Sequence, residues 1–531
     1  MVSKTNHNTY CILFAIIFSF SNCYIYMIEK NSLVDQWDYL LLLYNVMVIG
    51  VLCYTVILKI TLFQMSKLRE DVGAIHFSDI QYFCIVAVMI FLLWLPVFLA
   101  YYPGIFAYDV MDQIPQKAGS YNTHHPLIHT LYLQFFYYYV GKYIFNNYNI
   151  GIALASIVQM GLFSLMLSFS HLYLRRVGLC KTLRILLIIL NGILPVFSML
   201  AISMTKDTLF AGFVSLMFTF LCYQLTPDLQ SFFERCLYKI FYIISVVGVI
   251  TLRNNGIYPV AILAVILSIG MLKRRNSFHI LCYTVFGLLT GITFLICLKN
   301  NLHATPGSKN EMLSLPYQQL ACAYIDNHNK MSEDELLSIV NIIPDVDNYN
   351  PCLSDNIKFS AKGADNIKYL IATYIHIGFK YPQSYLKSFF VHNAGYFGLT
   401  DTSFSRIYGT TNRQGIFLSD TKDGFGIEHT SYFPELENLY ERLYTSNAYE
   451  YVFGLNLLCH PAFYMWLICF STLCIVIRKA KMFFPMCAFL FAYILTGFAG
   501  PCVLIRYALP YIACTPQLFI SAIRTGEVID G

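Results

Sequence analysis

The chain has 531 residues, of which 57% are hydrophobic and 12% charged, and its formal net charge at pH 7 is +5. A soluble domain carries about 25% charged residues, so this composition excludes an ordinary soluble protein. The small positive charge comes mainly from basic loops and does not indicate nucleic-acid binding. The cysteines lie mostly in apolar runs and lack the Cys/His spacing of a metal site, although Cys322 and Cys352, in the one long polar region, could pair.

Apolar runs of roughly 18 to 25 residues recur along the chain and are long enough to cross a bilayer. We therefore predict an all-α polytopic membrane protein. The first run, Tyr10–Met27, lacks a small-residue cleavage site and is soon followed by another run, so it is interpreted as a span rather than a signal peptide. About twelve transmembrane helices are predicted, at residues 10–28, 39–61, 80–101, 149–172, 183–202, 208–224, 238–252, 257–272, 278–298, 461–477, 483–499 and 502–523.

Basic residues in the short loops predict the topology, because Lys and Arg accumulate on the cytoplasmic side. With a cytoplasmic N-terminus, every basic cluster is cytoplasmic as well. We expect a multi-pass plasma-membrane protein with both termini in the cytoplasm and an extracytoplasmic segment at 299–460. The clusters are Lys67 and Arg69; Arg175, Arg176, Lys181 and Arg184; Arg235 and Lys239; Lys273, Arg274 and Arg275; and Arg478, Lys479 and Lys481.

The apolar stretch Pro126–Phe145 decides this topology, because one more span there would move two basic clusters outside. The stretch is interrupted by polar residues and is rich in tyrosine. Amphipathic aromatic helices suit the membrane interface. We therefore expect an interfacial helix within an outer loop, residues 101–148. The chain then divides into two N-terminal spans (1–79), a transmembrane core (80–298), an outer helical segment (299–460) and the C-terminal spans (461–531).

The motif YDVMDQIPQ follows the third predicted span. In a helical turn, Asp109, Asp112 and Gln113 share one face. Partial burial would raise the pKa of a carboxylate there and suit it to accept a proton from an attacking hydroxyl. The alternative is a solvated loop with helix-capping aspartates. Confinement between two membrane-anchored elements favours a site.

The motif NTHHPLIH comes next in the chain. His124 and His125 could donate to a phosphate or bind a metal. Adjacent residues on a helix or strand diverge, so the pair alone does not define a metal site. Pro126 also fits the first turn of an ordinary helix, and both interpretations stay open.

Further polar groups occur at the span ends opposite the basic clusters. A cation at a span end ordinarily extends toward the lipid headgroups, but charges at membrane depth mark functional sites by default. A cationic funnel for an anionic headgroup fits this set. Its members, in the motifs SMTKDT, LRNNGIY and RYALP, are Lys206, Asp207, Arg253, Asn254, Asn255 and Arg506.

The segment 299–460 is predicted to be mainly helical. Ser332 and Glu335 have the spacing of a capping box. Gln318 and Gln319 lie on another predicted helix and face unknown partners. The stretches YPQSYLKSFFVHNAGYFG and FPELENLYERLY are predicted to be interfacial and amphipathic, respectively.

The order of AYDVMDQ, THHPLIHTLYLQFFYYYVGKYIF and MTKD resembles the lipid-linked-sugar glycosyltransferases of the GT-C fold. These include protein mannosyltransferases, aminoarabinose transferases and oligosaccharyltransferases. Asp109 resembles the key aspartate of their first outer loop, His125–Pro126 the start of their interfacial helix, and Asp207 a second acidic position. More closely, YPGIFAYD, HHPLIHT, TKDTLFA, RNNGIY, LPYQQLA and SYLKSFF resemble an uncharacterised family of bacterial multi-span membrane proteins.

The GT-C resemblance implies transfer of a sugar from a polyprenyl-phosphate donor to a glycan, lipid or protein acceptor on the outer face. Asp109 would be the catalytic base of an inverting displacement. The implied phosphate contacts are His124, His125, Lys206, Arg253 and Arg506, and the other substrate contacts are Asp112, Gln113, Asp207, Asn254, Asn255, Gln318 and Gln319. No cofactor and no obligatory metal is expected, since no Walker loop, dinucleotide fingerprint or HExxH motif occurs.

Three alternatives remain. A polysaccharide polymerase or ligase shares about a dozen spans and one long outer segment, but lacks the aspartate and interfacial helix near the start. A transporter or flippase would show Gly/Pro breaks in matching halves, and the sequence has no convincing internal repeat. A structural membrane protein would tolerate replacement of Asp109.

Overall fold

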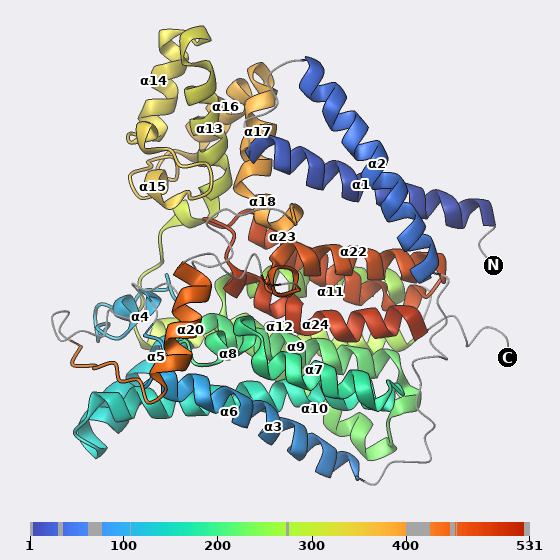
Figure 1. Cartoon of the computed structure of the whole chain (residues 1–531). Helices are drawn as coiled ribbons and strands as arrows, with labels where there is room; N and C mark the ends of the chain where they lie inside the picture. Colours follow the sequence, from blue (N-terminus) through green and yellow to red (C-terminus); the bar gives the residue numbers. More distant parts are fainter. Residues whose placement is uncertain are drawn as a thin grey trace.

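The computed structural model describes residues 4–29, 36–61, 77–106, 108–271, 275–399, 425–445 and 454–524, together with Val452. Within these ranges the chain is helical, and strand pairing is limited to isolated β-bridges. Figure 1 shows a bundle of long helices with a smaller group of helices, α13–α17, beside one of its ends. The prediction of an all-α protein is confirmed.

Each predicted span coincides with a helix or a helix pair. By length and hydropathy, 8 of the described helices could cross a membrane, or 9 if the bent pair α7–α8 is one span. The structure thus supports a multi-span membrane protein. The bundle helices are α1 (Lys4–Glu29), α2 (Gln36–Thr61), α3 (Asp79–Ala100), α6 (Tyr148–Arg176), α7 (Lys181–Ile193), α8 (Pro195–Ala201), α9 (Lys206–Leu225), α10 (Phe232–Leu252), α11 (Ile257–Met271), α12 (Arg275–Asn301), α22 (Pro461–Ile477), α23 (Phe484–Phe498) and α24 (Ile505–Arg524).

The predicted span 183–202 is a bent helix pair, in which α7 and α8 meet at an angle of 51°. Leu194 between them has an extended backbone, with φ −60° and ψ 129°. The following residue, Pro195, disfavours the helical conformation of the residue before it and then begins the next helix.

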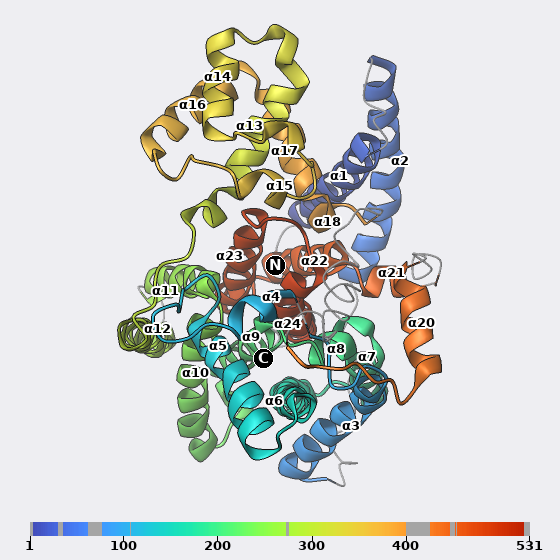
Figure 2. The same cartoon turned by 90° about the vertical axis from the view of Figure 1, so that its left-hand side faces the viewer.

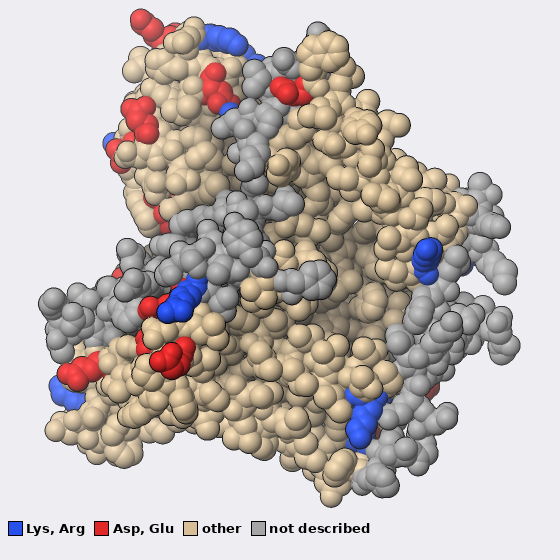
Figure 3. Space-filling model, viewed as in Figure 1, with Lys and Arg blue, Asp and Glu red and all other residues tan. Residues whose placement is uncertain are grey.

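Helix α9 forms the centre of the bundle and α2 lies on its outside. Of the apolar window of α9, 83% is buried, against 17% for α2. Both chain termini lie at the same end of the bundle, called here the terminal end, and α4 and α5 lie at the other, called the α4 end (Figure 1). Figure 3 shows a broad surface with few charges over the bundle, as expected of a surface that faces lipid.

A group of ion pairs holds α3, α6 and α10 together at the terminal end. The Arg176 guanidinium donates to Asp79 over 2.7 Å and also pairs with Glu234. Arg175 donates to the carbonyl of Ser78 over 3.3 Å. These predicted loop cations therefore hold the helices in register.

At the α4 end, the predicted helix Pro126–Phe145 is present but is not a regular α-helix. Helix α5 (Leu127–Gln134) continues into a π-helix, η3 (Phe135–Ile144). Phe135, Tyr139 and Tyr143 of η3 are exposed, which suits the interface of a membrane. The short helix α4 (Tyr108–Gln113) precedes α5.

The described part of the 299–460 segment is helical, as predicted, and its first helices have a hydrophobic core of their own, which includes Tyr317, Ile339 and Ile377. Ser332 and Glu335 form the predicted capping box. No disulfide joins Cys322 and Cys352. The α-helices of this segment are α13 (Ser314–Asn327), α14 (Glu333–Ile342), α15 (Asp355–Lys358), α16 (Ile367–Lys380), α17 (Pro382–His392), α18 (Ala394–Phe397), α20 (Pro434–Thr445) and α21 (Leu455–Leu458). Among all described residues, the short 3-10 helices are η4 (Pro227–Leu229), η5 (Asn254–Gly256), η6 (Lys309–Leu313), η7 (His328–Lys330), η8 (Val346–Asn348) and η11 (Lys481–Phe483).

Candidate functional site

Two backbone segments that are far apart in sequence pair at the α4 end. The amide of Ile105 donates to the carbonyl of Ile202 over 3.0 Å, and the amide of Met204 donates to the carbonyl of Ile105 over 2.9 Å. The first segment leads into α4 and the second into α9. This pairing brings Asp109, near the start of α4, beside Lys206, the first residue of α9.

Polar side chains of α6 hold both segments in place. Ser156 donates to the carbonyl of Pro103 over 3.0 Å. Gln159 donates to the carbonyls of Ala201 over 2.9 Å and Ser203 over 2.7 Å. The sequence analysis missed these two residues. The sequence signal that could have identified them is their spacing, since Ser156 and Gln159 are polar residues three positions apart and therefore lie on one face of an apolar helix.

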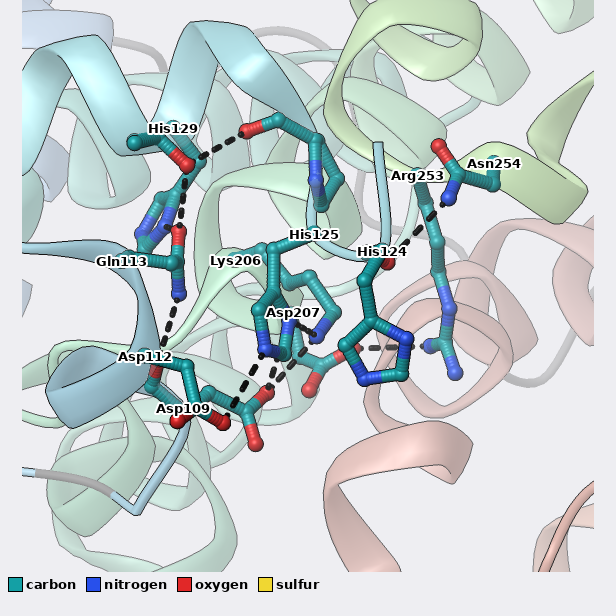
Figure 4. Close-up of polar contacts among 12 residues, drawn as sticks. Asp109, Asp112, Gln113, His124, His125, His129, Lys206, Asp207, Arg253 and Asn254 are labelled. Carbon is teal, nitrogen blue, oxygen red and sulfur yellow. Dashed lines mark hydrogen bonds and ion pairs between the residues drawn. The ribbon is translucent and has the colours of Figure 1, made fainter. Parts of the chain in front are cut away.

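Asp109, Lys206 and His125 form one half of a buried ion cluster (Figure 4). The Lys206 ammonium donates to Asp109 Oδ2 over 2.7 Å and lies 3.0 Å from His125 Nδ1. The Asp109 and His125 side chains are 12% and 6% exposed. Three predicted site residues from three separate motifs therefore meet at one point.

Asp207, Arg253 and Arg506 form the other half. Arg253, which follows α10, donates to Asp207 Oδ1 over 2.8 Å. Arg506, at the start of α24, lies 3.6 Å from Asp207 Oδ2 and 3.7 Å from Asp109 Oδ1. The Arg506 side chain thus joins the two halves, and the ion cluster consists of Asp109, His125, Lys206, Asp207, Arg253 and Arg506.

Aromatic rings line the arginine side of the ion cluster. The Tyr507 ring centroid lies 4.5 Å from the Arg253 guanidinium and 5.3 Å from that of Arg506. The Arg253 side chain also donates to the Tyr493 hydroxyl over 3.4 Å. A ring face between two guanidinium groups offsets part of their repulsion. The sequence analysis did not predict either tyrosine, because nothing distinguishes them from the chain's many others.

The charge of Asp109 is stabilised by its surroundings. Burial favours the neutral acid, but Lys206 and Arg506 outweigh burial and hold the pKa of Asp109 well below its usual range. The expectation that burial raises the pKa of this carboxylate is therefore wrong. In this state Asp109 is an ion-pair partner and a weak base.

His125 is a neutral hydrogen-bonding group in this site. Burial and the neighbouring Lys206 lower the pKa of His125 to about 3. An ammonium group can only donate, so Nδ1 of His125 accepts from Lys206 and the ring proton resides on Nε2. That proton faces Asp112 at 3.8 Å, beyond hydrogen-bonding distance.

The ion cluster has the properties of an anion-binding site. Three basic side chains, Lys206, Arg253 and Arg506, face two buried carboxylates. Two buried donors, Nε of Arg506 and Nε2 of His125, have no hydrogen-bond acceptor in the described structure. An anion bearing several oxygens would satisfy both donors and the excess positive charge. Within the described ranges, no group of three His, Cys, Asp or Glu side chains is placed to hold a metal ion.

The predicted residues Asn254, Asn255 and His124 border the ion cluster. Asn254 donates to the carbonyls of Thr123 and His124 over 2.9 and 3.3 Å. The imidazole of His124 is exposed and stacks edge-on against His125, with ring centroids 4.5 Å apart. Asn255 donates to Thr496 over 3.1 Å.

Asp112 and Gln113 lie in the same helical turn as Asp109, but the three side chains differ in burial. The Asp112 side chain is exposed, while Gln113 is buried. The Gln113 amide accepts from His129 over 2.8 Å and donates to the backbone carbonyl of Asp109 over 3.1 Å. The bond with His129 ties α4 to α5 and the bond to Asp109 lies within α4, so the described contacts of Gln113 are structural. Its binding role stays a prediction.

Gln318 and Gln319 lie away from the ion cluster, inside the core of the 299–460 segment. Gln318 donates to the carbonyl of Asn350 over 2.9 Å, and Gln319 donates to that of Tyr385 over 3.1 Å. The structure therefore does not bring this pair to the other predicted site residues.

The fold and the ion cluster define a multi-span helical membrane protein with a buried charged site at one end of its bundle. Residues 114–528 match the model of a family of unknown function, DUF6020, and the chain belongs to that family. The matched range includes every cluster residue except Asp109. No curated protein and no solved structure matches the chain.

Proposed function

We propose that the protein transfers a sugar from a polyprenyl-phosphate carrier to an acceptor at the outer face of the plasma membrane. The single observation that carries this proposal is the convergence of Asp109 with Lys206, Arg253 and Arg506 at one bundle end. A phosphodiester at a lipid headgroup is the anion that a cationic site at a span end can reach from the bilayer.

The proposed topology makes the α4 end the outer face. The clustered basic loops Arg175–Arg184 and Arg478–Lys481 lie at the terminal end, where both chain termini lie (Figure 1). The positive-inside rule favours the cytoplasm for that end. In this arrangement all twelve apolar helices cross or enter the membrane around a GT-C-like core, and the 299–460 segment is extracytoplasmic.

In the proposed reaction, Asp109 acts as base after the donor has bound. The phosphate shares Lys206 and Arg506 with Asp109, and the added negative charge raises the pKa of Asp109 from its low resting value. The acceptor oxygen gives its proton to Asp109 and forms a bond to the anomeric carbon, with inversion. The bond between that carbon and the phosphate oxygen breaks, and the electron pair stays on the departing polyprenyl phosphate.

His125, Lys206, Arg253 and Arg506 stabilise the charge that develops on the leaving phosphate. All four side chains are largely buried, so their interactions with that charge are strong. Asp207 keeps Arg253 oriented through the bond of 2.8 Å. No nucleotide is needed, which fits a reaction on the side of the membrane where nucleotide sugars are absent.

The test replaces Asp109 by Asn and compares envelope glycans and polyprenyl-phosphate binding with those of the wild type. The expected result is binding of polyprenyl phosphate by the purified variant together with loss of one glycan modification in cells. Asp228→Asn, at an exposed position of η4, is the matched control and should change neither. Identical glycan profiles for Asp109→Asn and the wild type would overturn the proposal.

A further inference from the structure

Helix α16 (Ile367–Lys380) has two apolar faces, although it lies outside the helix bundle. One face, which includes Leu370 and Ile377, is buried in the core of the 299–460 segment. A surface helix in water carries polar residues opposite its core face. The second face of α16 instead exposes an apolar stripe at intervals of four residues, which consists of Ile367, Ile371, Ile375 and Phe379.

The stripe is long and strongly exposed. Phe379 is 85% exposed and Ile375 51%. At about 1.5 Å per residue, the stripe extends over roughly 18 Å, three turns of helix. Contiguous exposed apolar surface of this kind marks contact with lipid or with another protein.

The attachment of the α16–α17 hairpin to the span α1 favours lipid. Helix α17 (Pro382–His392) follows α16 after a single residue and packs against α1. The Phe390 ring stacks edge-on against Tyr24, with centroids 5.2 Å apart. Just beyond α17, the amide of Leu399 donates to Asn22 over 2.8 Å. These contacts fix the α16–α17 hairpin at the α4 end of α1.

The bundle does not extend beneath the hairpin. Figure 2, viewed from the α4 end, shows α13, α14 and α16 displaced to one side of α6, α9 and α24. Helix α2, next to α1, exposes Leu40, Leu43 and Tyr44 near its α4 end. Lipid around α1 and α2 therefore reaches the level of the hairpin.

The charges of the hairpin fit an anionic lipid surface. Helices α16 and α17 contain Lys368, Lys380 and Lys387 and no acidic residue. Lys380 pairs with Glu335 at the start of α14 over 2.7 Å and Lys387 with Asp326 over 2.9 Å, so the basic neighbour of the stripe outside these pairs is Lys368. Lysines beside an apolar face are typical of helices that lie in the headgroup region.

We propose that the stripe of α16 is seated in the boundary between headgroups and acyl chains of the leaflet at the α4 end, where it anchors the 299–460 segment to the bilayer beside α1. The proposal concerns lipid contact alone and is independent of sugar transfer.

The experiment places a fluorescent reporter on the stripe of the full-length protein. Phe379→Trp and a control, Leu337→Trp on α14, are reconstituted in nanodiscs of phosphatidylcholine and phosphatidylglycerol, with or without brominated acyl chains. Leu337 is 58% exposed and lies on α14, which begins with acidic residues. The signal of the native tryptophans is subtracted by measuring the wild-type protein in the same discs.

For Phe379→Trp, the brominated chains are expected to remove about half of the difference fluorescence, while aqueous acrylamide has little effect, since an interfacial helix is buried by roughly 5–10 Å. For Leu337→Trp, acrylamide should quench the difference fluorescence and the brominated chains should have little effect. Quenching of Phe379→Trp by acrylamide alone would show that water covers the stripe. Protection from both quenchers would show that a protein covers it. Either result overturns the proposal.

Discussion

Lys206 donates to Asp109 over 2.7 Å although the two residues are 97 positions apart in the chain. The two residues belong to different helices, since Asp109 lies in α4, a helix of six residues, and Lys206 begins α9. No local structure therefore brings them together. Their contact depends on the backbone pairing between the segments around Ile105 and Ile202. The ion cluster therefore forms only when the tertiary fold is complete.

The contact between Lys206 and Asp109 can be measured by replacing each partner. Lys206→Met removes the nearest cation, so the pKa of Asp109 should rise and polyprenyl-phosphate binding should weaken. The protonated carboxyl band in infrared pH titrations, assigned by its loss in Asp109→Asn, gives the pKa. In a double-mutant cycle of unfolding free energies, the coupling should be about 0.5–3 kcal/mol. Additive effects of the two substitutions would contradict a direct interaction.

Replacing Arg253 should be more costly to stability than replacing a surface arginine. Arg253→Met leaves the fully buried carboxylate of Asp207 without its closest cation, and removal of one partner from a buried pair costs about 3–5 kcal/mol. Arg253→Lys should recover only part of this, since an ammonium cannot stack on Tyr507 as a guanidinium does. The midpoint of thermal unfolding in detergent provides the measurement. Arg235→Met, at an exposed position, should leave that midpoint nearly unchanged.

The loop that precedes α4 cannot accommodate a side chain at Gly104. Its φ is +123°, and a Cβ there would lie 2.1 Å from the Ser156 hydroxyl. Gly104→Ala should therefore lose at least about 1–3 kcal/mol of stability and displace Asp109. Gly119→Ala is the matched control, because Gly119 also has a positive φ, +86°, but nothing within 4 Å of its Cβ position. Equal unfolding midpoints for the two variants would contradict a steric role for Ser156.

Stability should decrease as the pH falls below about 6.5. Burial lowers the pKa of both His125 and His129 to about 3, so between pH 6.5 and 3 only the unfolded chain binds these protons. Each histidine then lowers the unfolding free energy by about 1.4 kcal/mol per pH unit. Asp109, whose pKa is also lowered, adds a loss only below about pH 4, the ordinary range of a carboxylic acid.

Denaturation of the protein at pH 7.5 and 5.5 tests this dependence. His129→Gln should reduce the difference in stability between the two pH values, whereas His328→Gln, at an exposed position, should not. An unchanged difference in the His129 variant would exclude His129 as a source of the pH dependence.

Hydropathy was sufficient to locate the bundle helices, because each one is a run of mainly apolar residues that is followed within a few positions by polar residues, glycine or proline. The break at Leu194–Pro195 and the π-helix Phe135–Ile144 were not predicted. Both keep the composition of a continuous apolar helix, and Pro195 was the local signal of the break. The sequence also predicted more spans than length and hydropathy support, since α11 and α22 are short and α24 is not among the candidate spans.

The site residues were predictable as charges placed at apolar ends, which explains why Lys206, Arg253 and Arg506 were identified. The pairing of cations with carboxylates was not predictable, since Arg506 contacts Asp109 and Asp207 across about 300 to 400 residues of chain. The direction of the pKa shift of Asp109 depends on those pairings, and the expectation from burial alone was wrong. Gln318 and Gln319 were chosen for their polarity, but their amides bind backbone groups of their own segment.

The charged groups of the cluster are attached to four different helices, α4, α9, α10 and α24, close to where each helix begins or ends. A slide of α24 along its axis by one turn, about 5.4 Å, would carry Arg506 out of reach of both aspartates while leaving every helix intact. Detergents that loosen the packing of the helices should therefore abolish the proposed binding of polyprenyl phosphate before circular dichroism shows any loss of helicity. Purification with the ion cluster intact then depends on choosing a detergent or lipid that keeps the helices packed against one another.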